Sequence, residues 1–331
     1  MSEAGPRISV VVPTFHRPAL LMRCLTALVR QRFDPAAFEI LVVDDGCSRA
    51  TQTAVDVLAG CCDRHPSIRY LRNEPTHGPA AARNRGWRHA AADIIAFTDD
   101  DTIPDPDWLA EGERSLGPDV AAVAGRVRVP RPGDARARPT DHELMTLGLE
   151  AAEFVTANAF VRRAALEAVG GFDERFARAW REDSDLQFRL LEQGKAIGRA
   201  AAAVVLHPVR PEPWGVSLRQ QKNVFYDALL FKKHPRLYRE RILANPPWNY
   251  YAVVALSVAT LVLWGLDIGG SAAVSGLFAL GLVVALALRR LRRTTWTPGH
   301  VLEMLATSAV IPFLSVYWRL RGALHFRVAY F

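Results

Sequence analysis

The chain has 331 residues, half of them hydrophobic, and a formal net charge of +7. That is enough apolar material for a sizeable core in one large domain or two smaller ones. Residues 289–331 hold seven arginines and one glutamate, so most of the excess charge lies at the C-terminal end. Because this segment follows an apolar stretch, its charge is typical of attraction to anionic lipid and argues against a nucleic-acid partner.

Residues 1–245 have the pattern of a soluble α/β protein. Short apolar runs predict strands at 8–12, 38–43, 68–71 and 94–98. Helical periodicity predicts helices at 19–32, 51–58 and 79–91. This alternation implies a mostly parallel, Rossmann-like sheet with flanking helices, in which ligands bind beyond the carboxyl ends of the strands. Residues 13–15, 44–45 and 99–101 follow three of these strands, so we expect them to meet at one edge of the sheet.

Three consecutive aspartates, Asp99, Asp100 and Asp101, follow the strand predicted at 94–98. Adjacent carboxylates repel one another, and burial near a strand end raises that cost. A divalent cation relieves the conflict, because hard cations prefer carboxylate oxygens and Mg²⁺ often also binds substrate phosphates. The aspartates therefore predict a metal site for a phosphate-bearing substrate. The alternative is a solvated acidic turn, where aspartate is common.

Three other candidate binding groups each have a structural alternative. Phe15 could stack on a nucleobase or belong to the core. Asp45 could accept a hydrogen bond from a base or a ribose, or it could only shape a turn. Arg83 lies on the helix that begins near Gly78, and a helix N-terminus favours anions, so it could reach a base or a diphosphate. It could equally be a surface arginine.

Two later groups offer proton transfer and a further metal ligand. Asp183, at the start of a predicted helix, could be the general base for an acceptor hydroxyl, and Trp180 could form an apolar wall beside it. Carboxylates at a helix N-terminus are also stabilised by the helix dipole, which requires no catalytic role. His207 could be a third protein ligand of the cation, or a structural histidine.

The order of these motifs resembles that of family 2 glycosyltransferases. The matching segments lie within residues 7–210 and read PTF, VVDDG, GPAAARNRG, FTDDD, GGFDERF and REDSDLQFRL. The resemblance implies an inverting enzyme with a GT-A fold that uses a UDP-, GDP- or dTDP-linked sugar together with Mg²⁺ or Mn²⁺. It implies Asp183 as the catalytic base and Asp99, Asp101 and His207 as the metal site, with His207 the weaker match.

The resemblance also implies two sets of substrate contacts. The nucleotide would be bound by Pro13, Thr14, Phe15, Arg17, Asp45, Arg83, Asp99 and Asp100. The sugar and acceptor pocket would be formed by Thr156, Asn158, Gly171, Phe172, Trp180 and Glu182. Residues 219–225 lack the Q-x-x-R-W motif of processive members, which favours transfer of a single sugar. Two other functions stay open: a metal-dependent nucleotidyl- or phosphotransferase, and an inactive membrane-anchored scaffold that binds nucleotide sugars.

From residue 246 onward the composition is that of a membrane protein. The uncharged stretches at about 249–266 and 271–288 are long enough to cross a bilayer, so we expect a transmembrane hairpin. Two buried helices of a soluble domain are the alternative. The positive-inside rule places the arginines that follow the second stretch in the cytoplasm, at the inner membrane, and the hairpin then puts the catalytic domain on the same side. We expect the apolar run 301–318 to lie in the interface or to dip in and back.

The predicted organisation has three parts. Residues 1–210 form the catalytic domain, with nucleotide-sugar binding at about 7–130 and the acceptor and base part at about 131–210. Residues 211–245 form an amphipathic region in which a helix capped by Ser217 lies on the bilayer near a lipid-linked or glycolipid acceptor, or packs on the catalytic domain. Residues 246–331 form the membrane region. Cys61, Cys62 and His65 lack the CxxC spacing of a zinc site.

Overall fold

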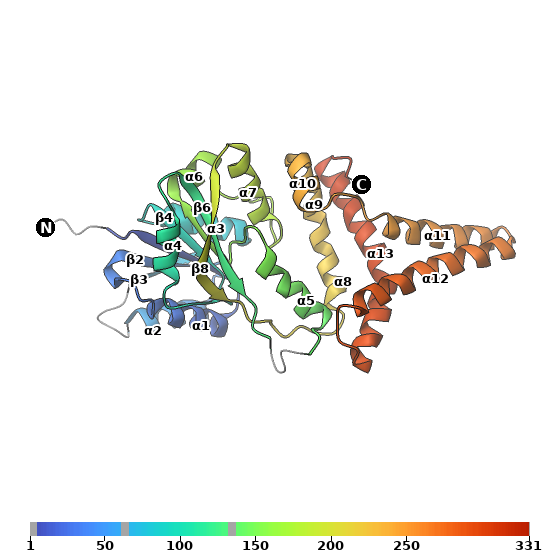
Figure 1. The fold of residues 1–331 in the computed structure, drawn as a ribbon, viewed down its shortest axis with the longest axis horizontal. Helices are drawn as coiled ribbons and strands as arrows, with labels where there is room; N and C mark the ends of the chain where they lie inside the picture. Colours follow the sequence, from blue (N-terminus) through green and yellow to red (C-terminus); the bar gives the residue numbers. More distant parts are fainter. Residues whose placement is uncertain (1–4, 61–65, 132–136, 331) are drawn as a thin grey trace. The chain divides into compact units, whose positions relative to one another are not determined.

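The computed structural model describes residues 5–60, 66–131 and 137–330, which form two compact units (Figure 1). The first unit comprises Met1–Arg131 and Leu147–Val209, and the second comprises Pro132–Thr146 and Arg210–Phe331. The division at Val209 lies one residue from the predicted end of the catalytic domain. The segment 132–146, which we expected in that domain, groups with the second unit instead. Cys61, Cys62 and His65 lie outside the described residues.

An eight-stranded mixed sheet forms the centre of the first unit, in the order β3-β2-β1-β4-β7-β6-β8-β5. Its strands are β1 (Ile8–Thr14), β2 (Phe38–Asp44), β3 (Ser67–Arg72), β4 (Ile94–Thr98), β5 (Ile103–Pro104), β6 (Val120–Arg128), β7 (Asn158–Arg162) and β8 (Ala196–Leu206). The first four strands are parallel, β7 is antiparallel to both β4 and β6, and β6 is parallel to β8. The predicted mostly parallel sheet is confirmed, and its mixed half follows β4.

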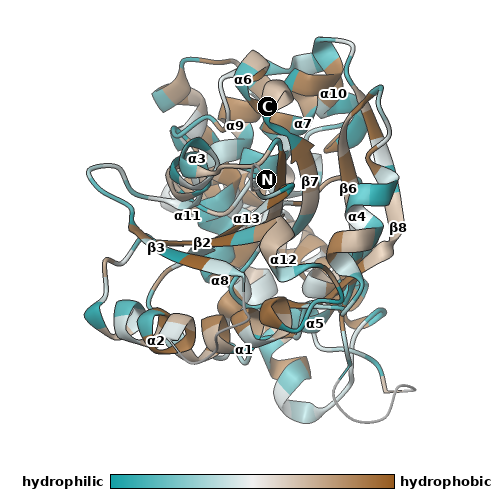
Figure 2. Cartoon of the chain, turned by 90° about the vertical axis from the view of Figure 1, so that its left-hand side faces the viewer, coloured by the Kyte–Doolittle hydropathy of each residue, from teal (hydrophilic) through white to brown (hydrophobic). Residues whose placement is uncertain are grey.

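Helices cover both faces of this sheet. The α-helices of the first unit are α1 (Pro18–Val29), α2 (Arg49–Gly60), α3 (Pro79–His89), α4 (Trp108–Ser115), α6 (Arg163–Val169) and α7 (Glu182–Glu192). Successive side chains of a strand point to opposite faces. Accordingly, Val10 and Val12 pack with Leu25 of α1 in one apolar cluster, whereas Val11 packs with Ala82 of α3 in another. Figure 2 shows β2 and β3 between α1 and α2 on one side and α3 on the other.

The carboxyl ends of β1, β2 and β4 meet at one edge, as predicted. The Asp45 amide donates to the Thr14 carbonyl across 2.9 Å, which joins the ends of β1 and β2. The Thr14 hydroxyl donates to Asp100 across 2.7 Å, which joins the ends of β1 and β4. The residues that follow these three strands therefore form one contiguous surface.

The second unit is helical. Its α-helices are α5 (Asp141–Leu147), α8 (Val216–Gln220), α9 (Val224–Lys233), α10 (Pro235–Arg241), α11 (Trp248–Gly265), α12 (Gly269–Leu291) and α13 (Pro298–Phe326). Short 3-10 helices occur in the chain at Pro35–Ala37, Gly148–Ala151 and Gln221–Asn223. Within the unit, α11 packs against α12, and α13 packs against α9, α11 and α12.

Three helices, α11, α12 and α13, are long and apolar enough to cross a membrane. On the α11–α12 hairpin, Leu261 is 74% exposed, Trp264 is 74% exposed and Leu277 is 68% exposed. So much exposed apolar surface is typical of contact with lipid. The third helix, α13, is a single 29-residue helix that continues through Pro312, so it is longer than the predicted run at 301–318. How α13 lies relative to a bilayer stays a prediction.

The prediction of one continuous helix capped by Ser217 is wrong about both the capping residue and the continuity of the helix. The segment is divided into α8, a 3-10 turn and α9, and the residue before α8 is Gly215 with a φ of +76°. Glycine adopts this left-handed conformation without steric cost, so it begins the helix in place of a hydroxyl cap. Ser217 lies inside α8, where its hydroxyl accepts a hydrogen bond from Arg290 across 3.2 Å.

Candidate active site

Asp100 holds the ends of β1 and β4 together. Its buried carboxylate accepts hydrogen bonds from the Thr14 hydroxyl at 2.7 Å and from Arg17 at 3.2 Å. Burial raises the pKa of Asp100 to about 6, while Arg17 and Thr14 act in the opposite direction. Thr14 and Asp100, both predicted to bind the nucleotide, are thus buried and already bonded to each other. Their side chains bond the ends of β1 and β4 to each other and do not project from this edge of the sheet.

Asp99, Asp101 and His207 offer three ligand atoms that lie within 4.8 Å of one another. Nε2 of His207 is 3.5 Å from Oδ1 of Asp101. His207 is buried, and its Nδ1 has no hydrogen-bond partner among the described residues, which is costly for a buried polar atom. Two carboxylates and an imidazole with an unused nitrogen form a donor set that suits a divalent cation. The structure therefore brings together the three residues predicted to bind the metal.

Arg83 joins this cluster to helix α7. Its guanidinium is 2.7 Å from Asp99 and 3.0 Å from Glu182, and its side chain is only 4% exposed. The alternative of a surface arginine is therefore excluded. Because each terminal nitrogen pairs with a different carboxylate, Arg83 fixes the position of Asp99 relative to the start of α7. The sequence predicted a nucleotide contact for Arg83 and did not predict this bridge.

The two acidic residues at the start of α7 have different environments. Glu182 is buried against Arg83, and burial raises its pKa while Arg83 opposes the shift. Asp183 is half-buried, and its Oδ1 accepts a hydrogen bond from the Ser184 amide across 2.7 Å. Burial raises the pKa of Asp183 too, against the lowering effects of the Ser184 amide and Arg83. Of this pair, Asp183 is the carboxylate with solvent access, which a general base requires.

The other predicted nucleotide contacts lie at the same edge. Phe15 is 52% exposed at the end of β1, so the core alternative does not apply to it. Pro13 and Arg17 are half-buried beside it. The Asp45 carboxylate accepts hydrogen bonds from the Gly78 amide at 2.9 Å and from the Asn73 side chain at 2.7 Å. Asp45 therefore shapes the turn before α3, as its structural alternative had it.

The predicted sugar and acceptor residues divide into two groups. Trp180 is half-exposed, and the Arg181 guanidinium lies 4.6 Å from the centre of its ring. Thr156, Phe172 and Asn158 are buried. The amide of Asn158 accepts a hydrogen bond from Trp108 and donates to the carbonyls of Arg126 and Ala203. The prediction for Asn158 is therefore corrected: its amide links buried strands and is not free to contact a sugar.

Asn84 was missed in the sequence although it holds the loop that contains Gly171 and Phe172. Its amide nitrogen donates to the Phe172 carbonyl and to Glu174, and its oxygen accepts from the Phe172 amide and from Trp87. Gly171 has a φ of +75°, and a Cβ there would lie 2.4 Å from the Asn84 oxygen. Phe172 packs against Phe97 with ring centres 5.3 Å apart. Gly171 and Phe172 are thus buried residues that stabilise the loop beneath the site.

Comparison with known families identifies the class of enzyme. The model described as "Glycosyl transferase family group 2" matches residues 94–318, and that described as "Glycosyl transferase family 2" matches residues 9–170. The chain belongs to the family 2 glycosyltransferases. The predicted family and enzyme class are confirmed, and this membership disfavours the phosphotransferase alternative.

Similar proteins share both sequence and fold with this glycosyltransferase. "Glycosyltransferase AglE" of Haloferax volcanii is 27% identical over 75% of this chain and 81% of its own length. "GalNAc(5)-diNAcBac-PP-undecaprenol beta-1,3-glucosyltransferase" of Campylobacter jejuni is 36% identical over 29% of this chain and 30% of its own. Among solved structures, one similar chain is "Mannosyltransferase PcManGT from Pyrobaculum calidifontis in complex with GDP-Man and Mn2+". The match covers 98% of this chain and 88% of that chain, with a TM-score of 0.57 and 20% sequence identity. This similarity establishes the GT-A fold. The chain spans less than two thirds of several other curated relatives.

Proposed function

We propose that this glycosyltransferase moves one sugar from a nucleotide-sugar donor to a lipid-linked acceptor, with inversion at the anomeric carbon and Asp183 as the base. The observation that carries the proposal is the Arg83 bridge. One buried guanidinium contacts both Asp99 of the metal cluster and Glu182 next to Asp183. Donor phosphates at the cluster and an acceptor hydroxyl at Asp183 would therefore be held in a fixed relation, which is what a direct displacement requires.

In the proposed step, the acceptor oxygen forms a bond to the anomeric carbon while the bond from that carbon to the donor phosphate oxygen breaks. Asp183 takes the proton of the attacking hydroxyl, and the nucleoside diphosphate leaves with the bonding electrons. The raised pKa of Asp183 supports this role, because a base is most effective when its pKa lies nearer the working pH. Phe15, exposed beside the metal cluster at the strand ends, would stack on the nucleobase.

Asp99, Asp101 and His207 would hold Mg²⁺ or Mn²⁺. The ion would offset the negative charge that develops on the departing diphosphate. The unpartnered Nδ1 of buried His207 supports this assignment from the protein side. PcManGT, whose structure is described as a complex with GDP-Man and Mn²⁺, supports it by similarity of fold.

The acceptor and the location are part of the same proposal. The three apolar helices would anchor the enzyme in the inner membrane, with the catalytic unit in the cytoplasm, and the arginine-rich end of α12 supports that orientation. The Campylobacter jejuni relative is named for a lipid-linked undecaprenol substrate, which supports an acceptor of that class.

The test uses the full chain reconstituted in nanodiscs. A panel of nucleotide sugars is first screened by thermal shift with Mn²⁺, because only a ligand that binds the folded state raises the transition temperature. The donor identified is then incubated with a polyprenyl diphosphate-linked sugar, which carries the attacking hydroxyl of the proposed step, and the product linkage is assigned by NMR. We expect metal-dependent release of nucleoside diphosphate and an inverted anomeric configuration. A product with retained configuration would contradict the assignment of Asp183.

A further inference from the structure

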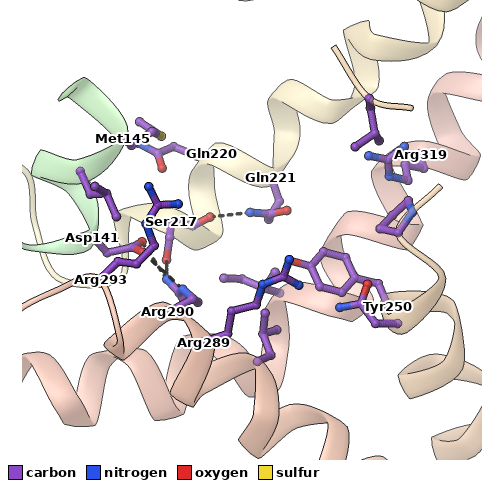
Figure 3. Close-up of a pocket in the computed structure, with 16 residues that line it drawn as sticks. Asp141, Met145, Ser217, Gln220, Gln221, Tyr250, Arg289, Arg290, Arg293 and Arg319 are labelled. Atoms are coloured by element: carbon purple, nitrogen blue, oxygen red, sulfur yellow. Dashed lines mark hydrogen bonds and ion pairs between the residues drawn. The ribbon is translucent and has the colours of Figure 1, made fainter. Parts of the chain in front are cut away.

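A pocket of about 660 Å³ lies entirely within the second unit (Figure 3). It is lined by residues of α5, α8, α11, α12 and α13, of the 3-10 helix Gln221–Asn223, and of the segments before α11 and directly after α12. Its volume is within the range of about 300–1,000 Å³ that small-molecule sites occupy. None of the catalytic residues described above lines it.

The charge of this pocket is strongly unbalanced. Its lining contains four arginines and one aspartate, a net charge of +3. The aspartate, Asp141, pairs with Arg290 at 2.8 Å. Figure 3 shows Arg290 between Asp141 and Ser217, to whose hydroxyl it donates at 3.2 Å. Arg290 also donates to the Thr307 hydroxyl at 2.7 Å, so it links α5, α8 and α13 to α12. The only carboxylate in the lining is therefore used by a structural arginine.

The other three arginines have unused donors. The side chains of Arg289 and Arg293 make no hydrogen bond or ion pair with any described residue. Arg319 is only 6% exposed, its Nη1 donates to the Tyr330 hydroxyl at 2.6 Å, and its Nε has no partner in the described part of the chain. Arg289 and Arg293 are exposed, so their guanidinium groups are available to an anion without breaking a contact within the protein. Arg319 differs, because the Tyr330 hydroxyl that it contacts is bonded to Tyr238, which donates to the buried Asp227.

The location and remaining lining indicate which kind of anion. Arg289 and Arg293 lie at the C-terminal end of α12, beside the N-terminal residues Asn249 and Tyr250 of α11, which is the end of the hairpin opposite its turn. This is where a bilayer surface would meet the hairpin. The remaining lining includes the amides of Gln220, Gln221 and Asn249 and an apolar part formed by Leu144, Met145, Leu243, Leu286 and Ile311. Guanidinium groups beside an apolar wall suit a phosphate that carries a hydrocarbon chain.

We infer that this pocket binds the phosphoryl group of a membrane lipid. Resting on the proposed function, the lipid is the polyprenyl diphosphate of a lipid-linked sugar, so that the sugar carries the acceptor hydroxyl and the phosphoryl group bound here is not the attacking group. Arg289, Arg293 and Arg319 contact the phosphoryl oxygens, Arg290 fixes the pocket shape, and the apolar wall receives the first carbons of the chain.

The experiment measures lipid binding to the full-length protein in nanodiscs by native mass spectrometry. The probes are a polyprenyl diphosphate-linked sugar, phosphatidylglycerol and inorganic diphosphate. The test variant is Arg289→Gln/Arg293→Gln, whose side chains have no partner in the described structure and whose loss should leave folding intact. The matched control is Arg236→Gln/Arg292→Gln, which removes two exposed arginines outside the pocket. Nucleotide-sugar hydrolysis without acceptor is the readout for the catalytic unit.

We expect the test variant to weaken binding of the polyprenyl diphosphate-linked sugar roughly 30-fold, the effect of two lost charges near a phosphate. The control should lose much less, and both should keep the hydrolysis rate of the unchanged protein. Equal losses in the two variants would overturn the inference, because the arginines would then act only as diffuse surface charge. Binding of inorganic diphosphate as tight as that of either lipid would overturn the lipid assignment.

Two comparisons separate this inference from the proposed function. Phosphatidylglycerol binding as tight as that of the polyprenyl diphosphate-linked sugar would support the lipid-phosphate pocket and contradict the acceptor as its ligand. The catalytic variant Asp183→Asn should bind the polyprenyl diphosphate-linked sugar like the unchanged protein. If that variant retained transfer, the proposed mechanism would fail while the pocket stood.

Discussion

The two units of this chain surround arginine with carboxylates to different extents. In the first unit, Arg83 lies between two carboxylates, Asp99 at 2.7 Å and Glu182 at 3.0 Å. In the second unit, four arginines share a pocket with one carboxylate, and the buried Arg319 keeps an N–H without a partner among the described residues. Nε of Arg83 and Nε of Arg319 both lack a partner among the described residues, so the difference lies in charge: Arg83 contacts two carboxylates directly, whereas the pocket lining has a net positive charge.

This difference distinguishes an arginine that positions other residues from arginines that are available to bind a ligand. A buried arginine that is bonded to two carboxylates resists movement, so Arg83 can fix the position of the metal cluster relative to the base. An arginine without a counter-charge keeps its binding capacity for a ligand. The same residue type thus builds rigid active-site geometry in one unit and a ligand site in the other, and the five predictions below test that division.

The largest expected effect is on catalysis in the first unit, where Arg83 is paired with carboxylates. Asp183→Asn should reduce transfer by about 10²–10⁴-fold, the usual contribution of a general base, because an amide cannot accept the hydroxyl proton. Nucleotide affinity, measured by calorimetry with Mn²⁺, should stay nearly unchanged, since Asp183 is not part of the metal cluster. Ser184→Ala is the control and should keep most of the activity. Transfer at the unchanged rate in Asp183→Asn would refute its role.

Removing the shared arginine should destabilise the first unit. Arg83→Met leaves the buried Glu182 and the half-buried Asp99 without their partner, and stranding a buried charge in this way costs about 3–5 kcal/mol. A thermal unfolding series would measure it, with Arg88→Met, an exposed neighbour on α3, as the control. Adding Glu182→Gln to Arg83→Met should recover part of the loss, because one stranded charge is removed. If the single variant were as stable as the control, Arg83 would not be the bridge described here.

Asp101→Ala should remove much of the metal-dependent gain in nucleotide affinity, on the order of tenfold or more, because the cation loses a carboxylate ligand. The measurement is a nucleotide titration with and without Mn²⁺. Asp107→Ala, an exposed aspartate a few residues further along the chain, should behave like the unchanged protein. An equal metal effect in all three proteins would exclude Asp101 as a ligand.

The pH dependence of activity should reveal the burial of the base. Asp183 acts only as a carboxylate, and burial raises its pKa above the ordinary value of about 3.9. As pH falls through this raised pKa the group protonates, so kcat/KM should drop about tenfold per pH unit, beginning above the range expected for an exposed aspartate. The residual activity of Asp183→Asn should lack this acid limb. An identical limb in both proteins would assign it to another group.

The smallest expected effect comes from the single carboxylate of the arginine pocket. Asp141→Asn keeps the side-chain shape and raises the net charge of the lining, so the polyprenyl diphosphate-linked sugar should bind about fivefold more tightly. Asp267→Asn, at the turn of the hairpin, should leave binding unchanged. Weaker binding in Asp141→Asn would mean that Arg290 needs its partner to keep the pocket open. The second unit would then also depend on an ion pair for its structure, as the first unit does.

The sequence predicted the parts of the site that depend on local pattern. Asp99 and Asp101 were identified because adjacent carboxylates at a strand end conflict unless a cation binds, and the meeting of the strand ends followed from the alternation of strands and helices. The bridge through Arg83 could not be predicted, because Glu182 is 99 positions away and only the fold brings it to 3.0 Å. Local propensity can place a residue on a helix but cannot identify its long-range partner.

Two errors have specific physical causes. Asn158 was assigned to the acceptor pocket from the family resemblance alone, yet its amide satisfies two carbonyls and an indole inside the sheet. Ser217 was assigned as a helix cap because serine favours that position, but Gly215 takes the left-handed conformation two residues earlier. In both cases, tertiary hydrogen bonding or backbone geometry overrode an expectation drawn from the sequence alone.

The hydrogen bonding of Asn84 sets a strict limit on mutational tolerance. Its side chain uses two donors and two acceptor positions on Phe172, Glu174 and Trp87 at once. Aspartate has nearly the same shape but no N–H, and leucine has neither donor nor acceptor, so both isosteres would leave buried backbone groups of Phe172 unsatisfied. Glutamine has the right chemistry on a longer stem. Asparagine is therefore the only natural residue that fits this position in both size and chemistry, and a scan of all substitutions should find no neutral replacement there.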